Sequence, residues 1–180
     1  HPELRPSGAR HWRRYGVSVV PPQVDRIEPV KFCHLPKTYV EVIRMTYGRK
    51  SAICGKLPEE PALCLLCGCV VAVNLREHDQ RRFEEGECTR HARTCGNGQG
   101  VFFLTHKALL LLVDAPKNAF TDVPYVDRHG ETDQHLARGR PMTFNPNMND
   151  NLRLLYTRAE IAREIIRNGE RTSRYIPTAL

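Results

Sequence analysis

The stretch VFFLTHKALLLLVD, residues 101–114, decides the fold of this 180-residue chain. It consists of two uninterrupted apolar runs joined by a short polar connection, Thr-His-Lys. Apolar runs of this length are typical of strands that are buried on both faces, and a three-residue connection favours antiparallel pairing. We therefore predict an antiparallel β core here. Neither run approaches the roughly 20 residues that a membrane-spanning helix needs, so no transmembrane segment is expected.

The segment before this hairpin predicts a helix and an extended arm. Pro36 opens LPKTYVEVIRMTYG, in which apolar side chains recur at helical spacing up to Gly48, and this pattern predicts about three turns of helix. PEEPALC, residues 58–64, is predicted to be a loop. Residues 1–34 contain five prolines up to Pro29 and show no sustained period, which is typical of an arm or linker that packs on another part of a protein.

The segment after the hairpin is turn-rich and then helical. DAPKNAF, residues 114–120, is expected to form turns, and Tyr125-Val126 is expected to form a short edge strand. A helix is predicted from near Asp150 to Asn168-Gly169, and the stretch TRAE at 157–160 resembles a capping box that could restart it. Residues 169–180 then form a polar tail.

The cysteines before the hairpin are spaced as metal ligands. Cys64 and Cys67 form a C-x-x-C pair, and Cys88 and His91 form a C-x-x-H pair, so two tight turns can present three sulfurs and one nitrogen to one ion. Cys95 lies four residues after His91, so a helical turn there would let it replace Cys88 or His91. We predict one structural Zn²⁺ in a closed site, with no catalytic residues.

The number of cysteines and the first residues of the sequence indicate in which cellular compartment the protein is expected. Seven cysteines are an odd number, and they lack the scattered even pattern of a secreted disulfide scaffold. This favours a reducing compartment, namely the cytoplasm, with the nucleus as a second location. The first residue is His1 and no charged-then-apolar leader precedes the body, so an excised soluble fragment is expected.

Two function classes other than a structural zinc domain have partial support in the sequence. The formal net charge of +7 and the pI of about 9.2 raise the alternative of a stand-alone zinc-dependent nucleic-acid-binding module. The basic residues are nevertheless spread along the chain, so nucleic acid is the less favoured partner. A zinc deaminase would need H-x-E before P-C-x-x-C, whereas His129-Gly130-Glu131 follows the cysteines here.

Five stretches occur in a fixed order, namely LPKTYVEVI, EPALCLLCG, GECTRHARTCGNGQGVFFL, PYVDRHGETDQHLARGRPM and the closing helix. Together they resemble the C-terminal domain of the UBR-box N-recognin E3 ubiquitin ligases, over about residues 35 to 166. The resemblance implies a zinc-stabilised cap that packs on the RING and helical regions of the same parent chain. It also implies E2 and ubiquitin as indirect partners, and N-degron substrates that bind other domains.

The resemblance assigns residues as well. It implies Cys64, Cys67, Cys88 and His91 as ligands, with Cys95 as a further family cysteine. In residues 124–142 the family pattern is matched at Tyr125, Asp127, Gly130, Glu131, Asp133, Arg138, Gly139 and Pro141, which implies a role in domain docking. The family commonly has two arginines before the glycine, whereas this chain has Ala137-Arg138. The acidic residues could instead pair with Arg138 and Arg140 within one turn, where exposed pairs contribute about 0–1 kcal/mol each.

We therefore expect an α+β fold: a small zinc-stabilised domain with an antiparallel β core, an N-terminal helix and a C-terminal helix. The expected organisation is an arm at 1–34, the domain at 35–168 and a flexible tail at 169–180. The expected function is that of a non-catalytic regulatory or scaffolding domain, with ubiquitin transfer carried out by a RING elsewhere in the parent ligase.

Overall fold

A computed structural model describes residues 30–73 and 85–172. Most of the predicted arm, residues 74–84 and the end of the tail lie outside these described residues. The elements are α1 (Tyr39–Thr46), β1 (Pro61–Cys64), β2 (Val70–Ala72), α2 (Glu87–Cys95), β3 (Gln99–Leu104), β4 (Leu109–Asp114), β5 (Lys117–Asp122), β6 (Tyr125–Val126), η2 (Gln134–Leu136), β7 (Thr143–Phe144), α3 (Pro146–Thr157) and α4 (Ile161–Thr172).

The predicted hairpin is the centre of the main sheet. β3 and β4 pair antiparallel along their whole length, and the strand order is β2-β1-β3-β4-β5, with every neighbouring pair antiparallel. Phe103 and Leu110 enter one apolar core, whereas Phe102 and Leu111 enter the other. Since side chains alternate along a strand, these uninterrupted apolar runs fill cores on both sides of the sheet. The prediction of a hairpin buried on both faces is confirmed.

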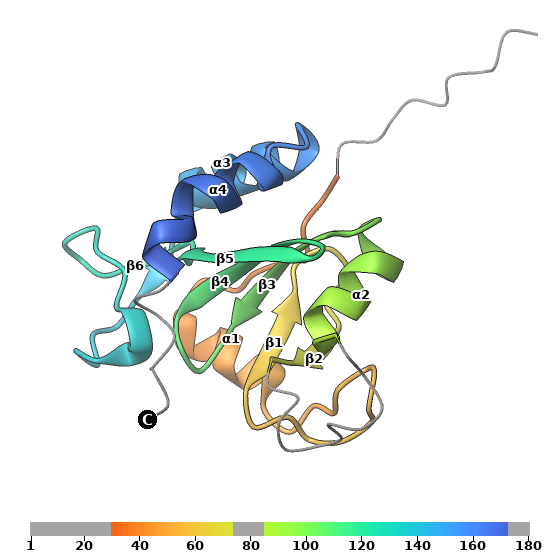
Figure 1. Ribbon diagram of the computed structural model, residues 1–180. Helices are drawn as coiled ribbons and strands as arrows, with labels where there is room; N and C mark the ends of the chain where they lie inside the picture. Colours follow the sequence, from red (N-terminus) through yellow and green to blue (C-terminus); the bar gives the residue numbers. More distant parts are fainter. Residues whose placement is uncertain (1–29, 74–84, 173–180) are drawn as a thin grey trace, which may run out of the picture.

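Helices cover the two faces unequally. The larger core receives Tyr39 of α1, Leu152 of α3 and Ile161 of α4, and Figure 1 shows α3 and α4 lying together near β5. The smaller core receives Cys88 and Ala92 of α2. β6 and β7 form a separate two-stranded sheet, so the expected short strand at Tyr125-Val126 is present. The α+β class with an antiparallel core is confirmed.

Two strands occur where turns were predicted. β1 is fully buried and lies between β2 and β3, although its sequence, within PEEPALC, was predicted to be a loop. Pro61 is its first residue, a position where a strand tolerates proline. β5 pairs with β4 from Lys117–Asp114 to Asp122–Leu109, and only Ala119 of this edge strand is buried. Its polar sequence does not have the apolar pattern of a strand, and its conformation becomes evident only from its pairing with β4.

The helix boundaries differ from the expected ones. α1 begins after Thr38, whose capping box with Glu41 shortens it to 8 residues. α3 begins at Pro146, because the Asn145 side chain accepts hydrogen bonds from the next two free amides. The chain breaks before α4 as expected, but the Thr157 hydroxyl donates to Arg153 O within α3 rather than capping a new helix. α4 then continues beyond the predicted stop to Thr172.

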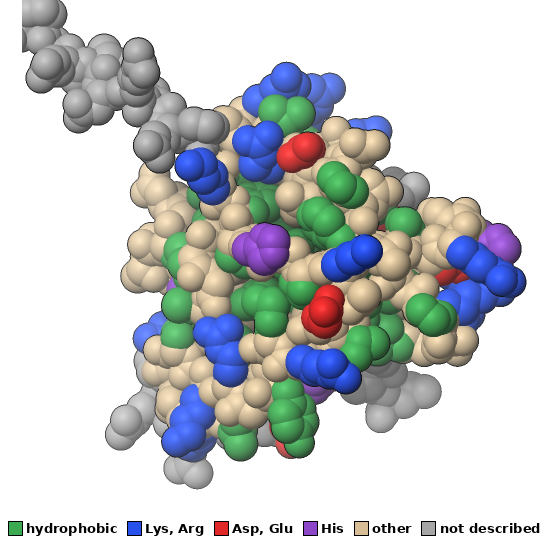
Figure 2. Space-filling model, turned by 180° about the vertical axis from the view of Figure 1, so that it is seen from behind, with side chains coloured by type: hydrophobic (Ala, Val, Ile, Leu, Met, Phe, Trp, Pro, Cys, Tyr) green, Lys and Arg blue, Asp and Glu red, His purple; other side chains and the backbone are tan. Residues whose placement is uncertain are grey.

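Two surface properties follow. Within residues 30–73 and 85–172, every helix is too short or too polar to cross a bilayer. Figure 2 shows the face opposite to that of Figure 1, on which Lys and Arg side chains are scattered among hydrophobic and other groups.

Candidate metal centre

The first pair of candidate ligands lies at the turn that joins β1 to β2. Cys64 is the last residue of β1, and Gly68 donates its N–H to Cys64 O at 2.8 Å. Gly68 has φ +73°, a left-handed conformation that favours glycine. The Cys69 N–H points at Cys67 Sγ at 3.5 Å. This tight turn presents both the Cys64 and the Cys67 sulfurs to the same side.

The second pair lies on α2. The Cys88 and His91 pair was expected to lie in a tight turn, with a helical turn as the condition for Cys95 to act as a ligand. The segment ECTRHARTC is a helix of 9 residues. His91 and Cys95 are four residues apart, so their side chains share one face of α2. Cys88 and Cys95 are seven residues apart, which separates them by about 10 Å along the helix axis. One ion cannot be held by both.

The structure groups Cys95, rather than Cys88, with the other three candidate ligands. The ligand atoms of Cys64, Cys67, His91 and Cys95 all lie within 4.8 Å of one another. Cys67 Sγ and His91 Nε2 are 3.2 Å apart, and ligand atoms around a tetrahedral zinc lie about 3.5 Å apart. These four residues could hold one metal ion.

The electrostatics of the group suit a cation. Burial raises the pKa of Cys64 well above its ordinary value, and the neighbouring Cys67 and Cys95 thiolates raise it further. Burial lowers the pKa of His91, so the neutral imidazole, which can bind a metal, is favoured. A divalent cation would stabilise the thiolates that the group otherwise disfavours. Three sulfurs and one nitrogen are a donor set of structural zinc sites.

Cys88 has different surroundings. Its thiol lies in the smaller apolar core and is 3.9 Å from Ala72 O. Burial raises the pKa of Cys88 to about 12, with the Glu87 carboxylate as a second cause. A thiol with these surroundings behaves as a small core side chain.

Glu87, which no sequence motif indicated, links α2 to two other parts of the domain. Its side chain is buried, and one oxygen, Oε2, accepts hydrogen bonds from Ser51 Oγ at 2.5 Å and from Ala72 N at 2.8 Å. The first bond reaches the loop between α1 and β1, and the second reaches β2. Glu87 therefore positions the helix that carries His91 and Cys95. An acidic residue in the first turn of a helix was the available signal.

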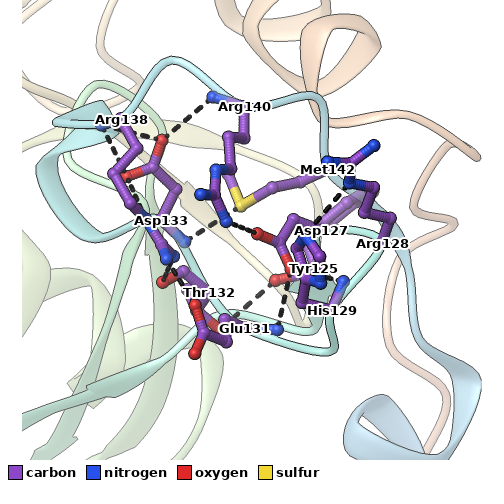
Figure 3. A network of polar contacts seen from close by, with 10 residues as sticks. All are labelled: Tyr125, Asp127, Arg128, His129, Glu131, Thr132, Asp133, Arg138, Arg140 and Met142. Atoms are coloured by element: carbon purple, nitrogen blue, oxygen red, sulfur yellow. Dashed lines mark hydrogen bonds and ion pairs between the residues drawn. The ribbon is translucent and has the colours of Figure 1, made fainter.

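Four of the predicted docking residues, namely Asp127, Glu131, Asp133 and Arg138, belong to a polar network in one loop (Figure 3). The buried Asp127 carboxylate accepts hydrogen bonds from His129 N at 2.8 Å, from Glu131 N at 3.1 Å and from Arg140 Nη1 at 3.0 Å. Asp133 is also buried and accepts from the main-chain amides of Arg138 and Arg140. The hydrogen-bond partners of both carboxylates therefore lie within the same loop.

The remaining residues of that set divide into two groups. Arg138 forms an ion pair with Glu131 and donates to Thr132 O at 3.0 Å, whereas Gly130, Gly139 and Pro141 are exposed. Tyr125 is a core residue instead. It is fully buried, its hydroxyl donates to Pro36 O at 2.6 Å, and its ring contacts those of Tyr39, Phe103 and Phe144.

The Asp127 contacts predict a pH-dependent contribution to stability. The Glu131 amide, together with the Arg140 guanidinium and the His129 amide, lowers the pKa of Asp127 to about 2 from an ordinary 3.8. A depressed pKa in the folded state stabilises the protein above pH 4, and this contribution is lost as the pH falls towards 2. The melting temperature of wild type should exceed that of Asp127→Asn at pH 5, and the difference should shrink towards pH 2.

Loss of a metal ion at low pH would lower the melting temperature of both proteins alike, so it does not contribute to the difference between them. Asp150→Asn removes an exposed carboxylate of α3 and is the matched control. A difference between wild type and Asp127→Asn that stays constant from pH 5 to pH 2 would contradict the prediction.

Comparisons with known proteins agree on one group. The family described as Proteolysis_6 C-terminal matches residues 9–158. The chain is 30% identical over 144 residues to E3 ubiquitin-protein ligase UBR2 of Homo sapiens, and the match covers 77% of this chain and 8% of that protein. It is 31% identical over 122 residues to E3 ubiquitin-protein ligase PRT6 of Arabidopsis thaliana, covering 68% and 6%. It is also 31% identical over 112 residues to E3 ubiquitin-protein ligase ubr3 of Danio rerio, covering 62% and 6%. The chain thus spans only 6% to 8% of the length of these relatives.

Proposed function

Because the chain belongs to the Proteolysis_6 C-terminal family and is a C-terminal domain of the UBR N-recognin E3 ubiquitin ligases, we propose that it is a non-catalytic regulatory or scaffolding domain. It packs on the RING-bearing region of its parent ligase and supports or restrains ubiquitin transfer from E2 to substrate. The RING recruits the E2, and N-degron substrates bind other domains of the parent.

The cluster of four ligand atoms supports this proposal most directly. The group of Cys64, Cys67, His91 and Cys95 joins the β1–β2 turn to α2. We propose that it holds one structural Zn²⁺, because three thiolates and one imidazole complete a tetrahedral shell without water. Such an ion contributes folding free energy and supplies no catalysis. It would hold α2 rigidly against the smaller core.

Docking through the loop at 127–141 is the second part of the proposal. The carboxylates of Asp127 and Asp133 are used inside the loop, so they fix its shape rather than reach a partner. The exposed side chains on the outside of the loop, Arg128 and His129 among them, are available to contact the RING-bearing region. A loop that is fixed before contact loses little conformational entropy on docking.

Discharge of ubiquitin from a charged E2 tests the proposal. We expect the isolated chain to leave the E2–ubiquitin thioester intact, because the acyl transfer is assigned to the RING. In the parent ligase, Cys95→Ser should change the rate of discharge, and so should Arg128→Glu at the loop. The control Arg163→Glu reverses an exposed charge on α4 and should leave the rate unchanged. Robust discharge by the isolated chain, or an unchanged rate in both ligase variants, would contradict the proposal.

A further inference from the structure

Two exposed apolar side chains lie at one hollow on the surface, and the residues that line this hollow lie outside the loop at 127–141. Tyr47 is 83% exposed and Leu57 is 57% exposed. Both line a hollow of about 260 Å³, together with Thr46, Gly48, Arg49, Pro58, Pro61 and His106. Figure 1 shows the loop between α1 and β1 at the opposite end of the molecule from α3 and α4. Large apolar groups gathered around a hollow are typical of protein-binding surfaces.

The loop that carries Leu57 is held in place from several sides. Ser51 donates its hydroxyl to buried Glu87, and its amide donates to Lys56 O at 2.8 Å. Ala52 N donates to Val70 O of β2 at 2.8 Å. These bonds fix the backbone on the inner side of the loop while Leu57 stays in solvent. The hollow is therefore a preformed surface, which lowers the entropic cost of binding.

The charges at this surface are mostly positive. Arg49 lines the hollow, donates to Gly68 O at 3.1 Å and is exposed, and the lining residues described here include no carboxylate. Two further exposed cations adjoin lining residues in the chain, since Lys50 follows Arg49 and Lys56 precedes Leu57. Of the two acidic neighbours, Glu60 pairs with Lys107 at 3.4 Å and Glu59 is exposed.

We propose that this surface, the Tyr47–Leu57 hollow, binds an acidic protein segment that inserts an apolar side chain. Tyr47, Leu57 and the proline rings contact the inserted side chain, and the surrounding cations pair with carboxylates on either side of it. Arginine and tyrosine at the edge of an apolar hollow are the residue types that dominate protein interfaces. The charge complementarity selects the partner and accelerates association. This inference does not depend on a role in ubiquitin transfer.

Titration of the ¹⁵N-labelled chain with two synthetic peptides tests the inference. One peptide is acetyl-DEDLFED-amide, and the other is the charge-reversed acetyl-KRKLFKR-amide. We expect the acidic peptide to shift the amide signals of Tyr47, Gly48 and Leu57 saturably, and the basic peptide to leave them in place. Tyr47→Ala and Leu57→Ser should each weaken binding about tenfold or more, because central apolar anchors carry most of the affinity. Lys50→Glu should weaken binding severalfold and reduce its dependence on salt.

Matched controls distinguish binding at the hollow from nonspecific binding to other exposed side chains. Ile166→Ser removes an apolar side chain of α4 that is 71% exposed, and Arg163→Glu reverses an exposed charge of the same helix. Both should bind the acidic peptide as wild type does. The inference is overturned if the acidic peptide does not bind, if both peptides shift the same amides, or if the hollow variants bind as tightly as the controls. Concentration-dependent shifts of these amides without peptide would assign the surface to a second copy of the chain and would also overturn it.

Discussion

Cys95→Ser is expected to release the metal ion and to unfold the region around α2. The ligand atom of Cys95 lies within 4.8 Å of those of Cys64, Cys67 and His91, and serine is a poor substitute for a thiolate ligand. A structural zinc contributes roughly ten kcal/mol or more of apparent folding free energy in small sites. Loss of even an outer-shell partner lowers metal affinity about 10–100-fold, so loss of a ligand should lower it further. Metal content by mass spectrometry and thermal unfolding of the purified chain measure both effects.

Cys88→Ala is the matched control, because it removes a thiol from the same helix. Cys88 lies in the smaller apolar core, so its loss should cost about 1–2 kcal/mol of unfolding free energy, as for other modest core truncations. The variant should still bind one equivalent of metal. If Cys88→Ala lost the ion and Cys95→Ser kept it, the ligand set would be the one expected from C-x-x-H spacing, and the grouping with Cys95 would be wrong.

The choice of Cys88 or Cys95 as the fourth candidate ligand illustrates what sequence spacing cannot predict. Spacing identified every residue of the group, since Cys95 was the named alternative. It could not decide between the two cysteines, because C-x-x-H suits a turn and H-x-x-x-C suits a helix. The helix itself was hard to predict, since among its apolar positions only Cys88 and Ala92 are buried. Its periodicity is carried by the candidate ligands His91 and Cys95 rather than by aliphatic side chains.

The sequence pattern likewise predicts some of the strands and not others. β3 and β4 were predictable because their apolar runs are continuous and fill two cores. β1 was not, since Pro58 precedes it, Pro61 is its first residue, and its burial depends on neighbours on both sides. β5 was not, since its sequence is polar and pairing with β4 decides its conformation. Local pattern therefore predicted the central hairpin, whereas long-range pairing decided β1 and β5.

Glu87→Ala is expected to destabilise the domain by about 2–6 kcal/mol. The substitution leaves two buried donors, Ser51 Oγ and Ala72 N, without their shared acceptor. A buried donor without a partner costs about 1–3 kcal/mol. Unfolding in urea at neutral pH, with metal present throughout, measures the loss. The result would be unexpected if Glu87→Ala unfolded at the same urea concentration as wild type.

Glu87→Gln provides the matched control, because the same oxygen, Oε2, accepts both hydrogen bonds. The glutamine carbonyl oxygen can take that position, so both donors keep an acceptor and only the charge-assisted part of each bond is lost. We expect a loss of about 1–2 kcal/mol in total for Glu87→Gln. Equal losses in Glu87→Gln and Glu87→Ala would mean that the negative charge, rather than the pair of hydrogen bonds, is what matters.

The same pair of variants tests whether α2, which carries the candidate ligands His91 and Cys95, affects the Tyr47–Leu57 hollow. Glu87 is the residue through which α2 holds Ser51, and Ser51 in turn holds the loop that carries Leu57. If that loop is preformed by these bonds, Glu87→Ala should weaken binding of the acidic peptide, because ordering the loop then costs free energy on binding. Glu87→Gln should bind as wild type does. Neither variant alters a side chain that lines the hollow, so a difference between them would show that the buried carboxylate acts on the surface through the loop.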